Sequence, residues 1–203
     1  MDSSGLEIEA KFHLANLPEV ERRVRQLGGR LVQPRVLEMN YRFDTPTGDL
    51  RPAKRVLRLR KDHACHLTYK APGSTTDGVS TRCEIETVID DLEAARAILE
   101  ALGYQVVFVY EKYRTVYALE AAHVMLDELP YGDFLEIEGE DKDIRALAGR
   151  LRLDWSAAVT AGYHALYERL RARRPLDPAR LTFDSMQGLK IAPEELSVSP
   201  ADA

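Results

Sequence analysis

Cysteine, long apolar runs and excess positive charge are all scarce in this chain, and each scarcity excludes a class of protein. Two cysteines in 203 residues are too few for a disulfide framework. No stretch approaches the roughly 20 consecutive apolar residues that a membrane-spanning helix requires. The opening MDSSGLEIEA also lacks an apolar run and is unlike a secretory signal peptide. We therefore expect a soluble, cytoplasmic protein with no membrane partner.

The charge balance and the spacing of the histidines exclude two further kinds of site. A formal net charge of −5 argues against binding to a nucleic acid duplex, which usually requires a basic domain or stripe. Any binding site for an anion must therefore be formed by a local cluster of basic residues. The residues that could form a zinc site are His63, Cys65, His66 and Cys83. Their spacing matches no recognised zinc-ligand pattern, so we interpret them as free core thiols and surface histidines.

The length and composition fit one domain with peripheral helices. With 45% hydrophobic residues, a chain of this size can bury a substantial core. Apolar residues at helical spacing predict helices over residues 17–29, 90–103, 142–153 and 156–174. We place the domain at residues 1–175 and expect a loosely ordered C-terminal extension over residues 176–203. The sequence is compatible with a monomer or a homodimer.

Eight segments are predicted to be strands because charged and apolar residues alternate along them. They span residues 6–14, 30–45, 55–61, 65–70, 82–89, 105–120, 122–129 and 134–140. In the first, LEIEAKFHL, Glu7, Glu9 and Lys11 share one face and apolar residues occupy the other. One such strand alone is typical of a sheet with one face in water. The turn-rich stretch at 71–81 is expected to be a mobile loop.

Charges of the same sign recur two residues apart on most of these strands. The pairs are Glu7-x-Glu9, Arg58-x-Arg60, Glu84-x-Glu86, Lys112-x-Arg114 and Glu136-x-Glu138. Neighbouring like charges repel by roughly a few tenths of a kcal/mol when exposed and by much more when enclosed. A polyanion with divalent cations would relieve that repulsion. Arginine and lysine bind phosphate oxygens, and carboxylates bind Mg²⁺ or Mn²⁺.

We therefore predict an α+β fold built on an eight-stranded antiparallel closed β-barrel. Closing the strands would place the charges inside a tunnel and leave the apolar faces outside. The helices rich in leucine and alanine would then cover the outer surface of the barrel. This arrangement inverts the usual one, in which the interior of a small barrel is apolar.

The ordered set of motifs resembles the CYTH superfamily, also called triphosphate tunnel metalloenzymes. The resemblance covers about residues 6–170 and comprises Glu7-x-Glu9-x-Lys11, Arg58-x-Arg60, Lys70, Glu84-x-Glu86, Lys112-x-Arg114, Asp127 and the segment FLEIEGE. It implies an antiparallel tunnel that binds triphosphate compounds and needs a divalent metal. Members of this family include inorganic tripolyphosphatases, thiamine triphosphatases, RNA triphosphatases and class IV adenylate cyclases.

By motif position, the resemblance implies roles for these residues. The triphosphate ligands would be Lys11, Arg58, Arg60, Lys70, Lys112 and Arg114. The metal ligands would be Glu7, Glu9, Asp127, Glu136 and Glu138. Glu84 and Glu86 would orient the basic side chains or serve a second metal. The candidate catalytic residues are Glu9, Lys11 and Glu138.

Three further residues have alternative interpretations. Tyr41 lies in MNYRFDT, which resembles the family's Tyr-Phe-Asp-Thr segment with Arg42 as an extra middle residue, so core packing and substrate contact both stay open. Arg82 would add a basic group at the tunnel mouth or be a solvated arginine. Trp155 is expected to anchor helix packing rather than to stack on a base.

The resemblance leads to three functional hypotheses. The leading one is metal-dependent hydrolysis of a phosphoanhydride bond in inorganic tripolyphosphate, a nucleoside triphosphate or thiamine triphosphate. The second is a class IV adenylate cyclase, in which the ribose 3′-hydroxyl of ATP attacks the α-phosphorus and pyrophosphate leaves. The third is a noncatalytic module that binds polyphosphate or nucleotides.

Overall fold

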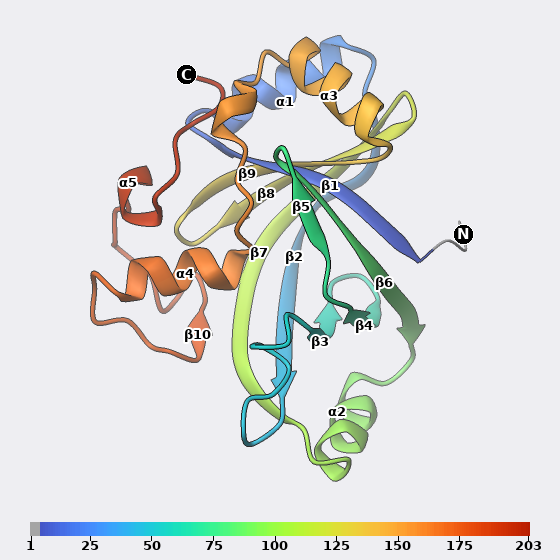
Figure 1. The fold of residues 1–203 in the computed structure, drawn as a ribbon, viewed down its shortest axis with the longest axis vertical. Helices are drawn as coiled ribbons and strands as arrows, with labels where there is room; N and C mark the ends of the chain where they lie inside the picture. The colour runs from blue at the N-terminus through green and yellow to red at the C-terminus, as the bar shows by residue number, and fades with distance from the viewer. Residues whose placement is uncertain (1–4) are drawn as a thin grey trace.

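The computed structural model describes residues 5–203, in which ten strands form one sheet. The strands are β1 (Leu6–Leu14), β2 (Arg30–Asp44), β3 (Val56–Lys61), β4 (Cys65–Lys70), β5 (Ser74–Thr76), β6 (Val79–Ile89), β7 (Gln105–Leu119), β8 (Ala122–Leu129), β9 (Gly132–Glu138) and β10 (Arg180–Leu181). The helices are α1 (Leu17–Gln26), α2 (Leu92–Ala101), α3 (Asp141–Arg150), α4 (Tyr163–Arg171) and α5 (Pro193–Leu196). In Figure 1, α1 and α3 lie at one end of the molecule and α2 lies at the other.

Eight of the strands form a closed antiparallel ring. Their order is β1-β9-β8-β7-β2-β3-β4-β6, and β6 pairs with β1 from Leu6↔Cys83 to Ala10↔Val79. The short strand β5 pairs with β6, and β10 runs parallel to β7 outside the ring. The predicted eight-stranded antiparallel barrel is therefore confirmed. A closed ring also leaves its long strands with no unpaired edge.

Two apolar clusters cover the outer surface of the ring. In β1, Ala10, Phe12 and Leu14 point outward and pack with Val20 of α1 and Ile144 of α3. The second cluster lies beneath α2 and is built from Phe43, Leu59 and Leu99, with Tyr41 packed against it. The period-two alternation of the strands thus places their apolar residues outside, under the amphipathic helices.

The side chains of two short polar residues fix where the first two helices begin. Asn16 precedes α1, and its side-chain oxygen accepts a hydrogen bond from the Glu19 backbone N–H at 3.1 Å. Asp91 precedes α2 and accepts one from the Ala94 backbone N–H at 2.9 Å. Both are N-caps of the kind that satisfies the free N–H groups of a first turn. No helix within residues 5–203 is long and apolar enough to cross a membrane.

A third apolar cluster occupies one end of the ring interior. On β7, Phe108 and Tyr110 are in phase with the inward-facing Lys112, so they also point inward. They pack in a cluster that includes Tyr163 and Tyr167 of α4. The inward rows therefore change from charged to aromatic, and α4 covers the aromatic end.

The C-terminal segment departs from two expectations. The sequence predicts one helix over 156–174, whereas the structure has a 3₁₀-helix at Trp155–Ala157 and starts α4 only at Tyr163. Between them, the Val159 backbone N–H bonds the Lys11 carbonyl at 2.7 Å, because this stretch runs along β1 instead of closing its own helical hydrogen bonds. The expected loose extension over 176–203 instead contains β10 and α5, and its Leu181 and Leu196 are fully buried.

The turn-rich stretch at 71–81 forms a hairpin where a mobile loop was expected. Strand β5 pairs with β6 through a two-residue turn at Asp77 and Gly78, whose φ angles are +46° and +83°. Positive φ at both central residues is the requirement of a type I′ turn, which Asp-Gly favours. Trp155 donates its indole N–H to the Asp77 carbonyl at 3.1 Å and packs edge-on against Phe12, so it anchors this hairpin to the outer core.

Candidate active site

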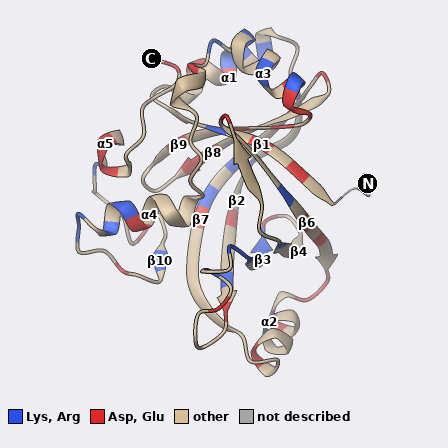
Figure 2. Cartoon of the chain, in the orientation of Figure 1, with Lys and Arg blue, Asp and Glu red and all other residues tan. Residues whose placement is uncertain are grey.

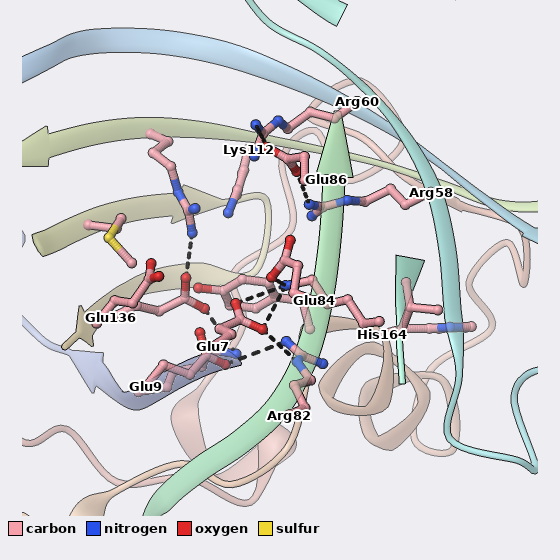
Figure 3. A pocket seen from close by; sticks show the side chains of 18 of the residues that line it. Glu7, Glu9, Arg58, Arg60, Arg82, Glu84, Glu86, Lys112, Glu136 and His164 are labelled. Carbon is pink, nitrogen blue, oxygen red and sulfur yellow. Dashed lines mark hydrogen bonds and ion pairs between the residues drawn. The ribbon is translucent and has the colours of Figure 1, made fainter. Parts of the chain in front are cut away.

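A cavity of about 360 Å³ lies inside the ring and receives side chains from all eight of its strands. Figure 2 shows charged positions recurring along β1, β6 and β7, and Figure 3 shows several of these side chains pointing toward one another. The predicted site residues that line the cavity are Glu7, Glu9, Lys11, Arg58, Arg60, Lys70, Arg82, Glu84, Glu86, Lys112, Arg114, Glu136 and Glu138. The ring therefore brings together charge pairs that lie far apart in the sequence.

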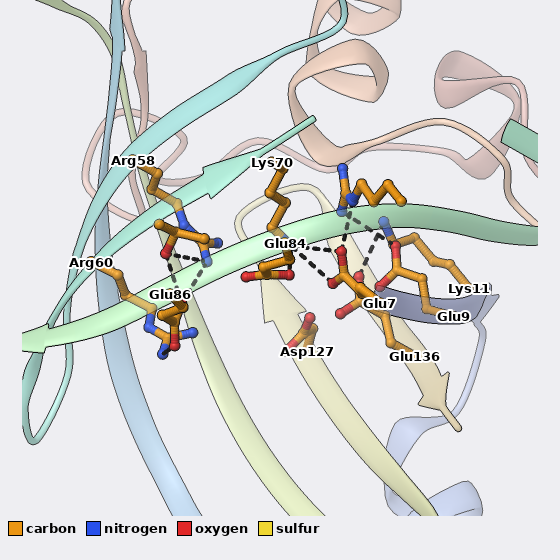
Figure 4. A network of polar contacts seen from close by, with 12 residues as sticks. Glu7, Glu9, Lys11, Arg58, Arg60, Lys70, Glu84, Glu86, Asp127 and Glu136 are labelled. Atoms are coloured by element: carbon orange, nitrogen blue, oxygen red, sulfur yellow. Dashed lines mark hydrogen bonds and ion pairs between the residues drawn. The ribbon is translucent and has the colours of Figure 1, made fainter. Parts of the chain in front are cut away.

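The carboxylate of Glu7 is held from two sides by cations, as Figure 4 shows for Lys70. Lys70 Nζ donates to its two oxygens at 2.8 and 3.0 Å, and Arg82 Nε donates to Oε2 at 2.6 Å. Burial by itself would raise the pKa of Glu7, but the charges of Lys70 and Arg82 lower it to about 2. Lys70 also lies 2.8 Å from Glu84, whose pKa burial raises. Glu7 is therefore ionised and well compensated.

Asp127, on the inner face of β8, holds two basic residues of the cavity in place. Its carboxylate is fully buried and accepts hydrogen bonds from Lys112 Nζ at 2.9 Å and from Arg114 Nε at 2.6 Å. The Tyr163 hydroxyl donates a further bond at 2.7 Å. Asp127 does not line the cavity. These contacts favour a positioning role, and the metal role expected from the sequence stays a prediction.

Glu136 is the third carboxylate that is balanced by two cations. Lys11 Nζ lies 3.1 Å from its Oε1, and Arg114 Nη2 forms a short hydrogen bond with its Oε2. Burial alone would raise the pKa of Glu136, but Lys11 and Arg114 hold it well below its usual value. Lys11 Nζ also lies 4.0 Å from the ring centre of Tyr163, which limits where the ammonium group can move.

Arg58 and Arg60 converge on a fourth carboxylate, that of Glu86. Arg60 Nη2 donates to Oε1 at 3.0 Å, and Arg58 Nη2 lies 3.5 Å from Oε2. The Thr68 hydroxyl donates to Oε2 at 2.7 Å. Burial would raise the pKa of Glu86, but Arg60 and this hydroxyl lower it. The geometry is that of a carboxylate that orients two guanidinium groups toward the cavity.

Glu9 and Glu138 differ from these carboxylates because cations do not balance them. They face each other directly across β1 and β9. Burial and the charges of Glu7 and Glu9 raise the pKa of Glu138 to about 7, and within residues 5–203 it forms no ion pair. Burial and Glu136 also raise the pKa of Glu9, whose one ion pair among the described residues is with Arg82 at 3.7 Å. This part of the cavity therefore carries excess negative charge.

The crowded carboxylates fit a hard divalent cation. Mg²⁺ and Mn²⁺ commonly take one or two protein carboxylates, with water and phosphate oxygens as the other ligands. Within residues 5–203, no three acidic, cysteine or histidine side chains already converge on one point. Glu9 and Glu138 meet the smaller requirement, and a cation between them would relieve the repulsion that raises both pKa values.

Several lining residues were not identified from the sequence. They are Arg42, Tyr110, Tyr163 and His164, with Glu38 fully buried behind Lys112. Glu38 and Arg42 lie four residues apart on β2, so the period-two rule could have placed both on the inner face. Tyr163 and His164 carried no such signal, since they lie within a segment that was expected to be helical throughout. Tyr41 packs outside the ring and does not line the cavity.

Comparisons with known proteins agree with this geometry. A putative adenylate cyclase of Methanocaldococcus jannaschii is 32% identical over 142 residues, which cover 68% of this chain and 79% of that protein. The solved structure of a putative adenylate cyclase from Vibrio parahaemolyticus has a TM-score of 0.71 at 23% identity and covers 78% of this chain and 95% of its own. A putative adenylyl cyclase from Hippeastrum, described as having a dominant triphosphatase activity, has a TM-score of 0.62 at 22% identity and covers 80% of this chain and 95% of its own.

The region that builds the ring is also the region that a known family matches. The CYTH domain matches residues 5–157, which contain all eight strands of the ring and every predicted site residue. The match ends before α4, so the segment that carries Tyr163 and His164 lies beyond it. The charged cavity inside a closed antiparallel ring, the sequence match and the shared fold lead to one conclusion: the chain belongs to the CYTH domain family.

Proposed function

We propose that this chain is a divalent-metal-dependent hydrolase that cleaves a phosphoanhydride bond of a small triphosphate compound inside its cavity. The observation that carries the proposal is that basic residues and uncompensated carboxylates line the same enclosed space. Phosphoryl transfer depends mainly on positioning and on charge stabilisation, and the cavity offers both. Tripolyphosphate, nucleoside triphosphates and thiamine triphosphate are the candidate substrates.

The basic residues would bind the phosphate oxygens and stabilise the charge on the transferred phosphoryl group. They are Lys11, Arg58, Arg60, Lys70, Lys112 and Arg114. Arginine can form two parallel hydrogen bonds with a phosphate, whereas lysine acts as a point charge. Asp127 and Glu86 hold four of these side chains before any substrate arrives. Such preorganisation reduces the reorganisation that the reaction itself would require.

The uncompensated carboxylates would hold the metal and take up a proton. Bound Mg²⁺ or Mn²⁺ would supply charge neutralisation at the phosphate oxygens. A general base works best when its pKa lies near the working pH. One of Glu138 and Glu9 would hold the metal, and the other, whose pKa burial and neighbouring carboxylates raise, would accept a proton from attacking water.

Adenylate cyclase is the second candidate, and the name of the relative at 32% identity favours it. Hydrolysis and cyclisation would both use the basic residues of the cavity to bind the triphosphate. They differ in whether water or the ribose 3′-hydroxyl attacks, and at which phosphorus. A noncatalytic binder is a weaker candidate, because a simple anion-binding site gains nothing from the crowded pair Glu9 and Glu138.

A single panel of assays separates these candidates. Tripolyphosphate, ATP, GTP and thiamine triphosphate are each incubated with the protein and either Mg²⁺ or Mn²⁺, and phosphate, pyrophosphate and cyclic AMP are measured together. We expect metal-dependent phosphate release from at least one substrate. Cyclic AMP and pyrophosphate formed in equal amounts from ATP would establish the cyclase instead. Metal-dependent binding without any product would contradict both enzymatic proposals.

A further inference from the structure

We propose that Arg42, with Arg58 and His164, forms a subsite that binds the terminal phosphate of the substrate at the end of the cavity covered by α4. The inference rests on the proposed function, because it assigns one end of the bound triphosphate. Arg42 is absent from the set of triphosphate ligands that the family resemblance implies. Figure 3 shows Arg58 and His164 on the side of the cavity away from Glu9 and Glu136.

Arg42 is the one cation of the cavity without a carboxylate partner among the described residues. Each of the other lysines and arginines that line the cavity has a carboxylate oxygen within 4.0 Å. Arg42 forms no ion pair or side-chain hydrogen bond within residues 5–203, and it is only partly exposed. Burial, followed by the charges of Arg58 and Arg51, lowers the pKa of its guanidinium. An uncompensated cation in this position needs an anion.

The strand register makes the charge imbalance larger. Arg42 on β2 lies directly opposite Arg58 on β3, and like charges in that position destabilise a sheet. Arg58 is nearly buried, and its partner Glu86 lies at 3.5 Å, while its other polar contacts are neutral hydroxyls. Among the described residues, the guanidinium groups of Arg42 and Arg58 therefore have between them only the carboxylate of Glu86 as an ion-pair partner, and Arg60 shares that carboxylate. A phosphate anion would resolve this as an external partner.

His164 supplies the third side of the subsite as a neutral group. Its ring stacks on Phe108 with centroids 4.1 Å apart and an interplanar angle of 8°. Burial, followed by the charges of Arg42 and Arg51, lowers the pKa of His164 to about 4, while Glu168 at 3.8 Å acts in the opposite direction. The ring lines the cavity, so a neutral imidazole there can donate one N–H to an anion.

The loop at 45–51 lies next to the subsite, and this neighbourhood favours a terminal phosphate. Asp44 follows Arg42 on the inner row of β2, and its carboxylate accepts the backbone N–H groups of Thr45 and Leu50, each at 2.8 Å. The loop is therefore held next to the subsite, and Arg51 joins it to α4 through Glu168 at 3.4 Å. A phosphate bound by Arg42 would face this loop and α4, which favours the end of a phosphate chain there over its middle.

The test compares Arg42→Gln with Arg51→Gln, which alters an exposed arginine of the neighbouring loop. Binding of tripolyphosphate and of ATP is measured by titration calorimetry in EDTA, so that no metal-dependent turnover consumes the ligand. We expect Arg42→Gln to weaken the binding of both ligands at least tenfold, because it removes a charged phosphate contact. Arg51→Gln is expected to change both affinities less than threefold.

Thermal unfolding without ligand separates a binding role from a structural one. Arg42→Gln removes an unpaired charge, so we expect the melting temperature of the free protein to stay the same or rise, and the shift caused by tripolyphosphate to shrink. Diadenosine triphosphate, which has no terminal phosphate, should bind the unaltered protein at least tenfold more weakly than ATP.

Each result has an opposite that overturns the inference. If the unaltered protein binds a triphosphate and Arg42→Gln binds it within twofold, the subsite does not exist. A lower melting temperature of the free variant with an unchanged ligand shift would make Arg42 a structural residue. Diadenosine triphosphate bound as tightly as ATP would exclude a terminal phosphate. If the unaltered protein binds no triphosphate at all, the proposed function itself fails.

Discussion

Asp127 and Glu138 lie on the neighbouring strands β8 and β9, on the same inner face of the ring, yet their electrostatic surroundings are opposite. Asp127 is fully buried and receives hydrogen bonds from a lysine, an arginine and a tyrosine. Glu138 has no ion pair within the described residues and lies among carboxylates that raise its pKa to about 7. The first acid balances the charge of the basic residues, and the second is left unbalanced.

Acidic residues in one cavity can therefore serve separate purposes. Compensated acids fix basic side chains and stabilise the fold, whereas uncompensated acids store repulsion that a cation or a proton relieves. The same division applies to the basic residues, because Arg114 forms ion pairs with three carboxylates, whereas Arg42 forms none within residues 5–203. Substitution of a compensated acid and of an uncompensated acid should therefore have different effects on stability.

The largest expected effect is on stability, through Asp127→Asn. Removing this charge leaves Lys112 and Arg114 buried beside a neutral amide, so we expect the free energy of unfolding to fall by about 3–5 kcal/mol. Urea denaturation at pH 7 measures the loss. The matched variant Glu138→Gln removes an unbalanced charge and should not destabilise the protein. Equal destabilisation by both variants would remove the distinction between the two acids.

The second prediction concerns turnover in Glu9→Gln. The substitution keeps the shape of the side chain but removes a candidate proton acceptor and metal ligand. We expect turnover to fall by about 100-fold or more, which is the usual range for losing a general base. Triphosphate binding in EDTA should change much less, because glutamine repels phosphate less than glutamate does. Parallel losses in turnover and binding would argue against the assigned role.

The third prediction is a pH dependence that originates from Glu138. A carboxyl whose pKa is higher in the folded protein than in the unfolded chain binds more protons when folded, so stability falls as pH rises between the two values. In EDTA, we expect the titration of Glu138 to lower the free energy of unfolding by about 1–2 kcal/mol between pH 4.5 and pH 7, less than the full shift would give because the side chain is half-buried. The effect is measured as the difference between the unaltered protein and Glu138→Gln, because His164, whose pKa is lowered to about 4, makes stability rise with pH over the same range.

The matched variant for this measurement is again Glu138→Gln. Its unfolding free energy should fall less, or rise more, over the same pH range, because glutamine does not titrate. Millimolar Mg²⁺ should recover part of the lost stability at pH 7 in the unaltered protein and less in the variant. A difference in unfolding free energy between the unaltered protein and Glu138→Gln that stays constant as pH rises over this range in EDTA would contradict the crowding of carboxylates.

The smallest expected effect is that of Tyr163→Phe. The change removes one hydrogen bond to Asp127 but leaves the bonds from Lys112 and Arg114 and keeps the ring beneath Lys11. We expect a loss of about 1 kcal/mol in unfolding free energy, which is typical of a single hydrogen bond. Thermal unfolding measures it. A loss as large as that of Asp127→Asn would show that the tyrosine, rather than the cations, dominates this cluster.

Strand periodicity made most of the ring and its lining predictable from the sequence. Side chains at even spacing share a face, so Glu7, Glu9 and Lys11 had to point the same way, and the closed ring turned that face inward. The same rule could have found Arg42 and Glu38. It cannot tell which acid is compensated, because Asp127 meets Tyr163 across 36 residues of chain.

The C-terminal segment was the least predictable part of the molecule. Its residues Val159, Tyr163 and His164 meet the ring through tertiary contacts that leave no local pattern. A helix was expected across residues 156–174 from apolar spacing alone, and the bond between Val159 and the Lys11 carbonyl overrides that propensity. Contacts between distant segments decide such positions, and a single sequence does not encode them in its spacing.

The outward apolar rows and the inward charged rows are separate sets of side chains on the same strands. Leu135 and Ile137 on β9 hold the helices, while the intervening Glu136 faces the cavity. Substitution of inward-facing residues can therefore change the chemistry of the cavity with little damage to the outer packing. This decoupling gives a physical route by which one scaffold diversifies during evolution, so that descendants with the same architecture acquire different chemistries.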